Sequence, residues 1–354
     1  MAIYLIINFA ILLISILHTT SRTFRASYSK MAFNFFCTAL WLFIGLRYKT
    51  GADWDAYIER MNHLVGANFS SVVEDDIAYG ILNWLSANIF GGIYFVNSIC
   101  AAITIYFIYK IIIQLPNYWA GLAVLFQPFF VYVAMNQTRQ GVAIAILSYL
   151  ALMEFEKRIN IKTLTLCLLA FFFHSSALIF LMFYFTTSIV SGSSGCLRMI
   201  LIILLILSIV YSFFEKFNYI FEFYVRDAVL IENSLSFFLL RIIMSLAAAI
   251  FLLLRKDQLI FDGAAINRYS ISSIPIIALL IIFSSGIVFI ERIAAYWIPL
   301  QAIAFTNQDK SYGLRPLYAA LFVGNTYFFV LVIWFLSSSV SEFWIPYDNL
   351  LLNL

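Results

Sequence analysis

Apolar runs, separated by short polar segments, dominate this sequence and restrict what it can fold into. Backbone groups find no water inside a bilayer, so such runs fold as helices that satisfy their own hydrogen bonds. Hydrophobic residues make up 64% of the chain and charged residues 11%, which excludes a soluble globular protein. The predicted spans are residues 1–17, 31–46, 93–113, 119–135, 140–153, 161–173, 177–190, 197–214, 237–254, 269–289, 292–305 and 317–336. We expect an all-α polytopic membrane protein of about 12 transmembrane helices, forming a single transmembrane domain over residues 1–354.

One pair of these spans leaves an alternative open, and one further apolar segment is not counted as a span. Segments 161–173 and 177–190 are short and flank His174, so they form either two helices or one long tilted helix. Segment 77–90 is apolar but interrupted by polar side chains, which favours an amphipathic helix lying on the outer surface. The interrupting residues are Tyr79, Asn83, Ser86 and Asn88.

The distribution of Lys and Arg predicts the orientation, because cytoplasmic loops of membrane proteins are enriched in both. With the N-terminus outside, most of the 21 basic residues fall on the cytoplasmic side. These are Arg22, Arg25, Lys30, Lys110, Lys157, Arg158, Lys162, Arg198, Arg255, Lys256, Arg268, Lys310 and Arg315. The run 1–17 lacks a basic leading segment and a small-residue cleavage site, so we expect a retained first span. Both termini are therefore predicted to lie outside.

With this orientation, the polar clusters of the chain fall at the outer ends of the predicted helices. The longest polar segment is an outer loop over residues 47–92, and residues 215–236 form a second outer loop. The other clusters occupy residues 136–140, 173–176, 291–296 and 344–347. We expect these clusters to meet on one side of the membrane.

The segment 47–57 combines carboxylates with aromatic rings. Gly51 can release the chain from the preceding helix, and Asp53 stands at a plausible cap of a new one. In such a helix Asp53, Tyr57 and Arg60 share one face. An aromatic ring suits the apolar face of a sugar, and a carboxylate suits its hydroxyls. The candidates are Asp53 and Asp55 as catalytic carboxylates and Trp54 and Tyr57 as sugar-binding rings, unless the segment is an interfacial loop with an ordinary cap.

Arginines at similar predicted depth indicate an anion-binding site. Arg139 stands among amides and hydroxyls at a predicted helix start, an array of fixed donors suited to a phosphate or pyrophosphate. Arg292 opens another predicted helix, and Arg241 lies near the start of its own span. The predicted diphosphate-binding residues are Arg47, Arg139, Gln140, Arg241 and Arg292, and Asn136 and Tyr296 join the predicted sugar contacts. The alternative is arginines that extend to the interface without binding a ligand.

His174 interrupts a strongly apolar region, where it is either a hydrogen-bonded core residue or a general base near neutral pH. The chain has no phosphate-binding glycine loop, no HExxH and no His/Cys cluster with metal-ligand spacing, so we predict no cofactor and no metal. A net charge of +3 without a basic block argues against nucleic acid as a partner. The four cysteines are scattered in or beside apolar runs, and we interpret them as small core residues.

Together, these motifs resemble the EpsG/Wzy-like family of polysaccharide polymerases. The matching features are R-Y-x-x-G-x-D-W-x-x-Y after the second span, N-x-x-R-Q-x-x-A, F-H-x-S-A-L, E-R-x-x-x-Y and a W-x-P-Y tail, in that order. The resemblance implies a GT-C-like glycosyltransferase of the bacterial inner membrane that joins undecaprenyl-diphosphate-linked oligosaccharides on the outer side. The positions that match its motifs are Asp53, Tyr57, Arg139, Gln140, His174 and Arg292. The short outer loops differ from polymerases with one large periplasmic loop, and the need for a chain-length regulator or a flippase stays open.

The mechanism expected from this resemblance transfers a growing glycan from its lipid diphosphate to the terminal hydroxyl of a lipid-linked repeat. Arginines would stabilise the departing diphosphate, and Asp53, Asp55 or His174 would accept the proton of the hydroxyl. Three alternatives remain. An O-antigen ligase would use the same donor with another acceptor, a membrane acyltransferase would need an acyl donor, and a secondary transporter or flippase would place its site at the midplane of inverted repeats.

Overall fold

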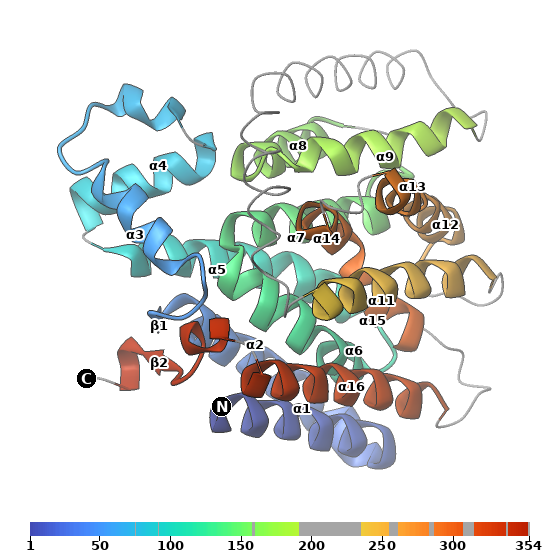
Figure 1. Ribbon diagram of the computed structural model, residues 1–354. Coiled ribbons are helices and arrows are strands. Elements are labelled where there is room, and N and C mark those ends of the chain that lie inside the picture. Colours follow the sequence, from blue (N-terminus) through green and yellow to red (C-terminus); the bar gives the residue numbers. More distant parts are fainter. Residues whose placement is uncertain are drawn as a thin grey trace.

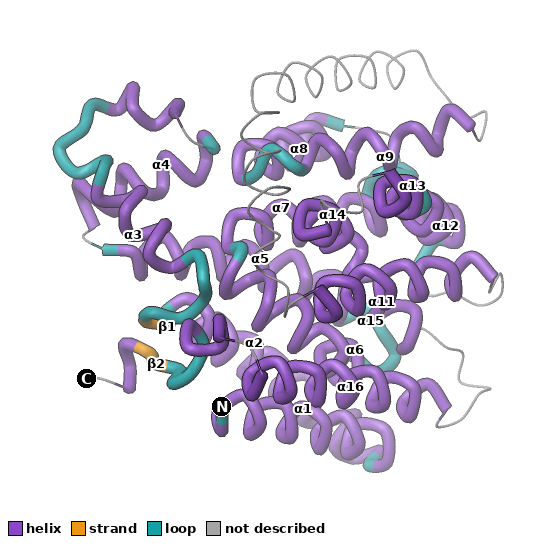
Figure 2. Tube along the Cα trace, viewed as in Figure 1, coloured by secondary structure: helices purple, strands orange, loops and turns teal. Residues whose placement is uncertain are grey.

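Helices form nearly all of the computed structural model, which describes residues 1–74, 76–90, 92–157, 160–190, 235–254, 261–282, 287–306, 315–337 and 339–352 (Figures 1 and 2). The first α-helices are α1 (Ala2–Thr20), α2 (Ser29–Gly45), α3 (Trp54–Asn62), α4 (Ile77–Leu85), α5 (Ile93–Ile112), α6 (Tyr118–Leu125), α7 (Thr138–Met153), α8 (Ile161–Phe173) and α9 (Ala177–Val190). The later ones are α11 (Leu235–Leu254), α12 (Gly263–Ile271), α13 (Pro275–Ile282), α14 (Ile287–Ala294), α15 (Ile298–Thr306) and α16 (Arg315–Ser337). The predicted helical class is confirmed, with one added strand pair, β1 (Arg47–Tyr48) against β2 (Asp348–Asn349).

The described helices are those of a multi-pass membrane protein. Four are long and apolar enough to cross a bilayer: Ala2–Thr20, Ile93–Ile112, Gly263–Leu280 and Leu317–Ser337. Shorter apolar helices accompany them, which a membrane protein accommodates where neighbouring helices shelter their ends. The count of about 12 spans and the GT-C-like architecture stay predictions. The predicted span 197–214, the predicted loop 215–236 and Cys196 lie outside the described residues.

Two predicted helices have different bounds in the structure. The predicted span 269–289 corresponds to the apolar helical segment Gly263–Leu280, which begins earlier and is divided, because α12 ends at Ile271 and α13 begins at Pro275. Proline has no N–H to donate and disfavours helical geometry in the residue before it, so it begins a helix more readily than it continues one. Arg292 does not open a helix as predicted. It lies in the last turn of α14, and a 3-10 turn at Ala295–Trp297 separates it from α15.

The alternative left open around His174 is resolved in favour of two helices. Helix α8 starts beside Glu154, which accepts a hydrogen bond from Lys162 at 3.3 Å. Helix α9 returns to the same region, where the Tyr184 hydroxyl donates to Glu156 at 3.2 Å. The two helices therefore run in opposite directions, and His174 lies in the turn between them.

The predicted amphipathic helix over residues 77–90 is α4, extended by a π-helical turn at Ser86–Phe90. Its polar residues Tyr79, Asn83 and Ser86 are buried against the protein. Ile77, Ile89 and Phe90 are exposed instead. The polar side of this helix thus faces the interior of the protein.

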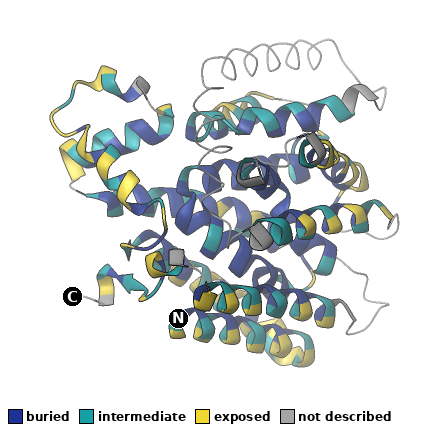
Figure 3. Ribbon diagram, viewed as in Figure 1, coloured by how far each residue is buried: buried dark blue, intermediate teal, exposed yellow. Residues whose placement is uncertain are grey.

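Helix α7 lies between α1 and α16 on one side and α8 and α9 on the other, and it is almost entirely buried (Figures 1 and 3). It begins at Thr138, near β1, and ends at Met153, beside the start of α8. We call the end of the molecule around β1 and Thr138 the site end, and the opposite end, around Met153, the far end. The five predicted polar clusters that the structure describes, one of which begins on α14, meet at the site end.

Candidate functional site

Arg47 anchors the loop that precedes α3. Its side chain is fully buried and donates to the carbonyl of Ile44 at 2.7 Å and to the carbonyl of Thr50 at 3.2 Å. It also donates to the hydroxyl of Thr138 at 2.8 Å. These bonds join the end of α2, the loop and the start of α7. The guanidinium group therefore donates its hydrogen bonds to acceptors within the protein.

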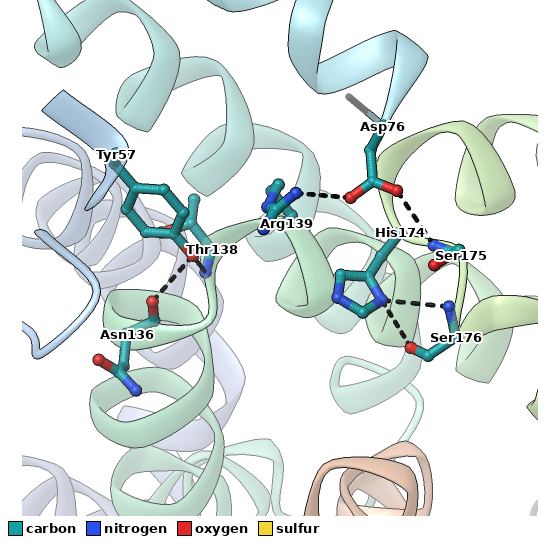
Figure 4. A network of polar contacts seen from close by, with 8 residues as sticks. All are labelled: Tyr57, Asp76, Asn136, Thr138, Arg139, His174, Ser175 and Ser176. Carbon is teal, nitrogen blue, oxygen red and sulfur yellow. Dashed lines mark hydrogen bonds and ion pairs between the residues drawn. The ribbon is translucent and has the colours of Figure 1, made fainter. Parts of the chain in front are cut away.

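The Tyr57 hydroxyl joins α3 to the start of α7. It donates to the carbonyl of Asn136 at 3.0 Å and accepts from the N–H of Thr138 at 3.1 Å (Figure 4). Burial, and then the nearby negative charge of Asp53, raise the pKa of Tyr57 to about 12. The phenol therefore stays protonated, and remains a donor, at any physiological pH.

Gly51 brings this loop against α7. It has φ +105°, and a Cβ atom there would lie 2.9 Å from the carbonyl oxygen of Met135. Only glycine allows both the backbone conformation and the close approach. Two residues later, the N–H of Asp53 donates to the Asn136 side chain at 3.2 Å. Asp53 precedes α3 as predicted, but its side chain does not cap that helix.

Arg139 pairs with a carboxylate that the sequence reasoning missed. Its Nη1 lies 2.7 Å from Oδ2 of Asp76, and the other oxygen of Asp76 accepts from the N–H of Ser175 at 3.3 Å (Figure 4). The rings of Tyr57 and Tyr79 lie 6.0 Å and 5.3 Å from the Arg139 guanidinium carbon. Asp76 thus joins α4, α7 and the turn after α8. The available signal was the acidic run at residues 74–76 directly before α4.

His174 has a defined tautomer in this arrangement. Its Nδ1 accepts from the backbone N–H of Ser176 at 3.2 Å and lies 2.6 Å from the Ser176 hydroxyl. An acceptor nitrogen carries no proton, so the hydroxyl also donates to it and the ring proton of neutral His174 is on Nε2. The Ser176 oxygen in turn lies 2.8 Å from the hydroxyl of Tyr296, which donates to it.

Arg292 and Asp53 form the partly open side of the site. Their charged groups lie 4.0 Å apart, with 26% and 31% of each side chain exposed. The backbone carbonyl of Arg292 accepts from the Gln140 amide at 2.5 Å. Gln140 therefore holds the last turn of α14 against the start of α7, which places Arg292 and Arg139 at the same end of the molecule.

Arg241 lies next to this group, on α11. Its Nε is 2.9 Å from Glu291, whose side chain is 1% exposed, and its guanidinium carbon is 3.7 Å from the ring centre of Tyr132. Glu291 precedes Arg292 in α14, so one helical turn presents a carboxylate to Arg241 and a cation to Asp53.

The remaining predicted residues have different surroundings. Trp54 is buried, with its ring centre 5.9 Å from that of Tyr48, and Asn136 and Tyr296 are also buried. Asp55 is exposed on the side of α3 opposite Trp54 and Tyr57. Among the described residues, no group of three or more His, Cys, Asp or Glu is placed to hold a metal ion.

A family model provides the comparison that identifies the chain. The model of the EpsG family matches residues 30–349, which is most of the sequence. The chain belongs to the EpsG family. No curated protein and no solved structure matches it. EpsG membership indicates a membrane protein of the polysaccharide polymerase type. The match includes all the motif residues brought to the site end, from Asp53 to Arg292.

Proposed function

We propose that this EpsG-family protein is a polysaccharide polymerase that joins undecaprenyl-diphosphate-linked oligosaccharide repeats on the outer face of the bacterial cytoplasmic membrane. The growing glycan on one lipid diphosphate is the donor, and a sugar hydroxyl of an incoming lipid-linked repeat is the acceptor. One observation carries the proposal. Arg139 and Arg292, which are 153 positions apart in sequence, lie at one end of the helix bundle with Asp53, His174 and Asp76.

Arg139 and Arg292 are the proposed ligands of the donor diphosphate. Each is already near a carboxylate, Asp76 at 2.7 Å and Asp53 at 4.0 Å. A diphosphate offers the same acceptor geometry with more charge, so it can replace these carboxylates as the arginine partner. Binding of the diphosphate to Arg292 would then release Asp53 from Arg292, which is its only cationic partner among the described ion pairs. A preorganised arginine is typically worth about 3 kcal/mol of barrier when charge develops on a leaving group.

Asp53 is the proposed general base. In the transfer step, Asp53 accepts the proton of the acceptor hydroxyl while that oxygen forms a bond to the anomeric carbon of the donor sugar. The bond between this carbon and the diphosphate oxygen breaks, and the electron pair leaves with the lipid diphosphate. Arg139 and Arg292 stabilise the charge that develops there. His174 carries its proton on Nε2, so we assign it as a hydrogen-bond donor and not as the base.

The buried residues have positioning roles in this proposal. Arg47 and Tyr57 fix the start of α7, from which Arg139 projects. Gln140 fixes the α14 turn that carries Arg292. Tyr296 orients His174 through Ser176.

The decisive experiment measures turnover of a lipid-linked repeat by the purified full-length chain. The wild type and the exposed-surface variant Arg22→Ala are expected to make a ladder of glycans, whereas Arg139→Ala and Asp53→Asn are expected to lose at least 100-fold in rate. Arg139→Lys should lose activity too, because lysine cannot make a bidentate contact. A product that carries one added unit and forms only with lipid A core would indicate a ligase. Dependence on an acyl donor would indicate an acyltransferase. Transport of the lipid-linked glycan without a new glycosidic bond would indicate a flippase.

A further inference from the structure

A small cavity beside the site is lined by Arg241 and by two buried polar groups without hydrogen-bond partners. It has a volume of about 40 Å³ and lies between the π-helical segment Phe126–Ala134, α11 and α16. Its lining residues are Gln127, Pro128, Tyr132, Arg241, Tyr327, Val330, Leu331 and Trp334. A cavity needs about 10–15 Å³ to hold one water-sized group, so this one takes several polar atoms.

The polar groups of this cavity are mostly donors. The Nε2 of Gln127 and the hydroxyl of Tyr327 are both buried without a hydrogen-bond partner among the described residues. Arg241 uses Nε for Glu291, and its two Nη groups make no hydrogen bond within the described residues. An unbonded polar group inside a membrane domain is destabilising, so two of them beside the arginine indicate a ligand that supplies acceptors.

The cavity also has an apolar wall that leads toward the exposed side of α16. Val330, Leu331 and Trp334 of α16 are half-buried, and the adjacent residues Phe329 and Ile333 are exposed. Arg241 itself keeps 15% of its side chain exposed. Donors inside and an apolar wall at the surface fit an amphiphile with an anionic head and a hydrocarbon tail.

The cavity adjoins the reaction site without being part of it. Tyr132 lies one helical turn before Asn136, and Glu291, the partner of Arg241, precedes Arg292. The structure therefore has two arginine positions, one at Arg139 and Arg292 and the other at Arg241. A polymerase that joins two lipid-linked substrates must hold two lipid phosphates at once.

We infer that the Arg241 cavity binds the phosphate of the second lipid carrier, that of the acceptor, with its polyprenyl tail along α16. This inference rests on the proposed function, since only a reaction between two lipid-linked substrates requires both sites. Arg241 stays paired with Glu291, so the head group binds to the two Nη groups, to Gln127 and to Tyr327. The Arg139 and Arg292 site then receives the donor.

The test measures equilibrium binding of radiolabelled geranylgeranyl diphosphate to the full-length chain in phosphatidylcholine nanodiscs. Wild type and Arg22→Gln are expected to bind two molecules per chain. The double variant Arg241→Gln, Glu291→Gln removes both members of the ion pair, so neither charge is left unpaired. This variant should bind one molecule per chain. Retention of two molecules by this variant would overturn the inference, as would equal competition by inorganic diphosphate or by phosphatidylglycerol.

A second variant separates binding from folding. Gln127→Leu removes a buried donor that has no protein partner, so the melting temperature should stay the same or rise. Affinity at the second site should fall about tenfold, because a hydrogen bond to a charged group is lost. Unchanged affinity would contradict the inference. A different result is that Arg139→Gln binds two molecules while the Arg241 double variant binds one. That result would support the second site and contradict the proposed donor site at Arg139.

Discussion

At the scale of single residues, burial separates the arginines that the motifs do not distinguish. Arg47 is fully buried and donates to protein acceptors, whereas Arg139 and Arg292 have carboxylate partners and stay partly exposed. All three were expected to bind a diphosphate. The geometry instead supports a positioning role for Arg47 and leaves the other two for the ligand.

This difference predicts opposite phenotypes for matched substitutions. Arg47→Met leaves the carbonyls of Ile44 and Thr50 without a donor, so the free energy of unfolding should fall by about 3 kcal/mol. Arg139→Met should lower turnover with a smaller effect on stability. Melting temperature in detergent and turnover per folded chain measure the two effects. An Arg47→Met protein that melts like the wild type but makes no glycan would assign Arg47 to the substrate.

Tyr57 gives a second prediction, on stability and pH. Tyr57→Phe leaves the Asn136 carbonyl and the Thr138 N–H unbonded, which should cost about 2 kcal/mol of unfolding free energy. The folded pKa of about 12 lies above the ordinary value of 10.0, so the stabilisation is complete below pH 10 and is lost as the pH rises toward 12. Denaturant unfolding from pH 7 to 12 should show a shallower alkaline loss for Tyr57→Phe. An identical slope in both proteins would contradict this role.

At the scale of elements, α4 provides a substitution in which stability and activity should move in opposite directions. Asn83 is fully buried, and neither its Nδ2 nor its Oδ1 has a hydrogen-bond partner. Asn83→Leu should therefore raise the free energy of unfolding by about 1 kcal/mol. If the polar side of α4 contacts the sugar beside Arg139, turnover should fall about tenfold. Ile77→Ala, on the exposed side of the same helix, is the control. Unchanged turnover in Asn83→Leu would remove α4 from the site.

The same scale shows what the sequence could predict. Helices α8 and α9 were predicted with the bounds that the structure has, because uninterrupted apolar runs end at polar residues. The break before Pro275 was missed, since the apolar run continues through it. The 63-residue separation between Asp76 and Arg139 explains why their ion pair was not found. Periodicity reports on neighbours along a helix, whereas this contact depends on how three elements pack.

At the scale of the whole molecule, the C-terminal tail completes the site end. The N–H of Gly51 donates to the carbonyl of Phe343 at 2.8 Å, and the N–H of Leu350 donates to the carbonyl of Leu46 at 2.9 Å. The Tyr347 hydroxyl donates to the carbonyl of Phe43 at 2.6 Å. The tail thus supports the loop that carries Asp53, although nearly 300 residues separate them. The predicted convergence of motifs depends on this closure of the chain.

The last prediction concerns which side of the membrane holds the site. The far end carries basic residues such as Lys110, Lys157 and Lys162, the last two beside Glu154. Because basic segments stay in the cytoplasm, the site end should face outward. The test uses a variant in which serine replaces the four native cysteines. Single cysteines are then introduced at two exposed positions, Val65, which is 61% exposed, and Lys157, whose side chain is 66% exposed. In intact cells with a permeable outer envelope, an impermeant maleimide should label Val65→Cys but not Lys157→Cys. The reverse pattern would put the site in the cytoplasm, where the proposed reaction between outward-facing lipid-linked glycans does not occur.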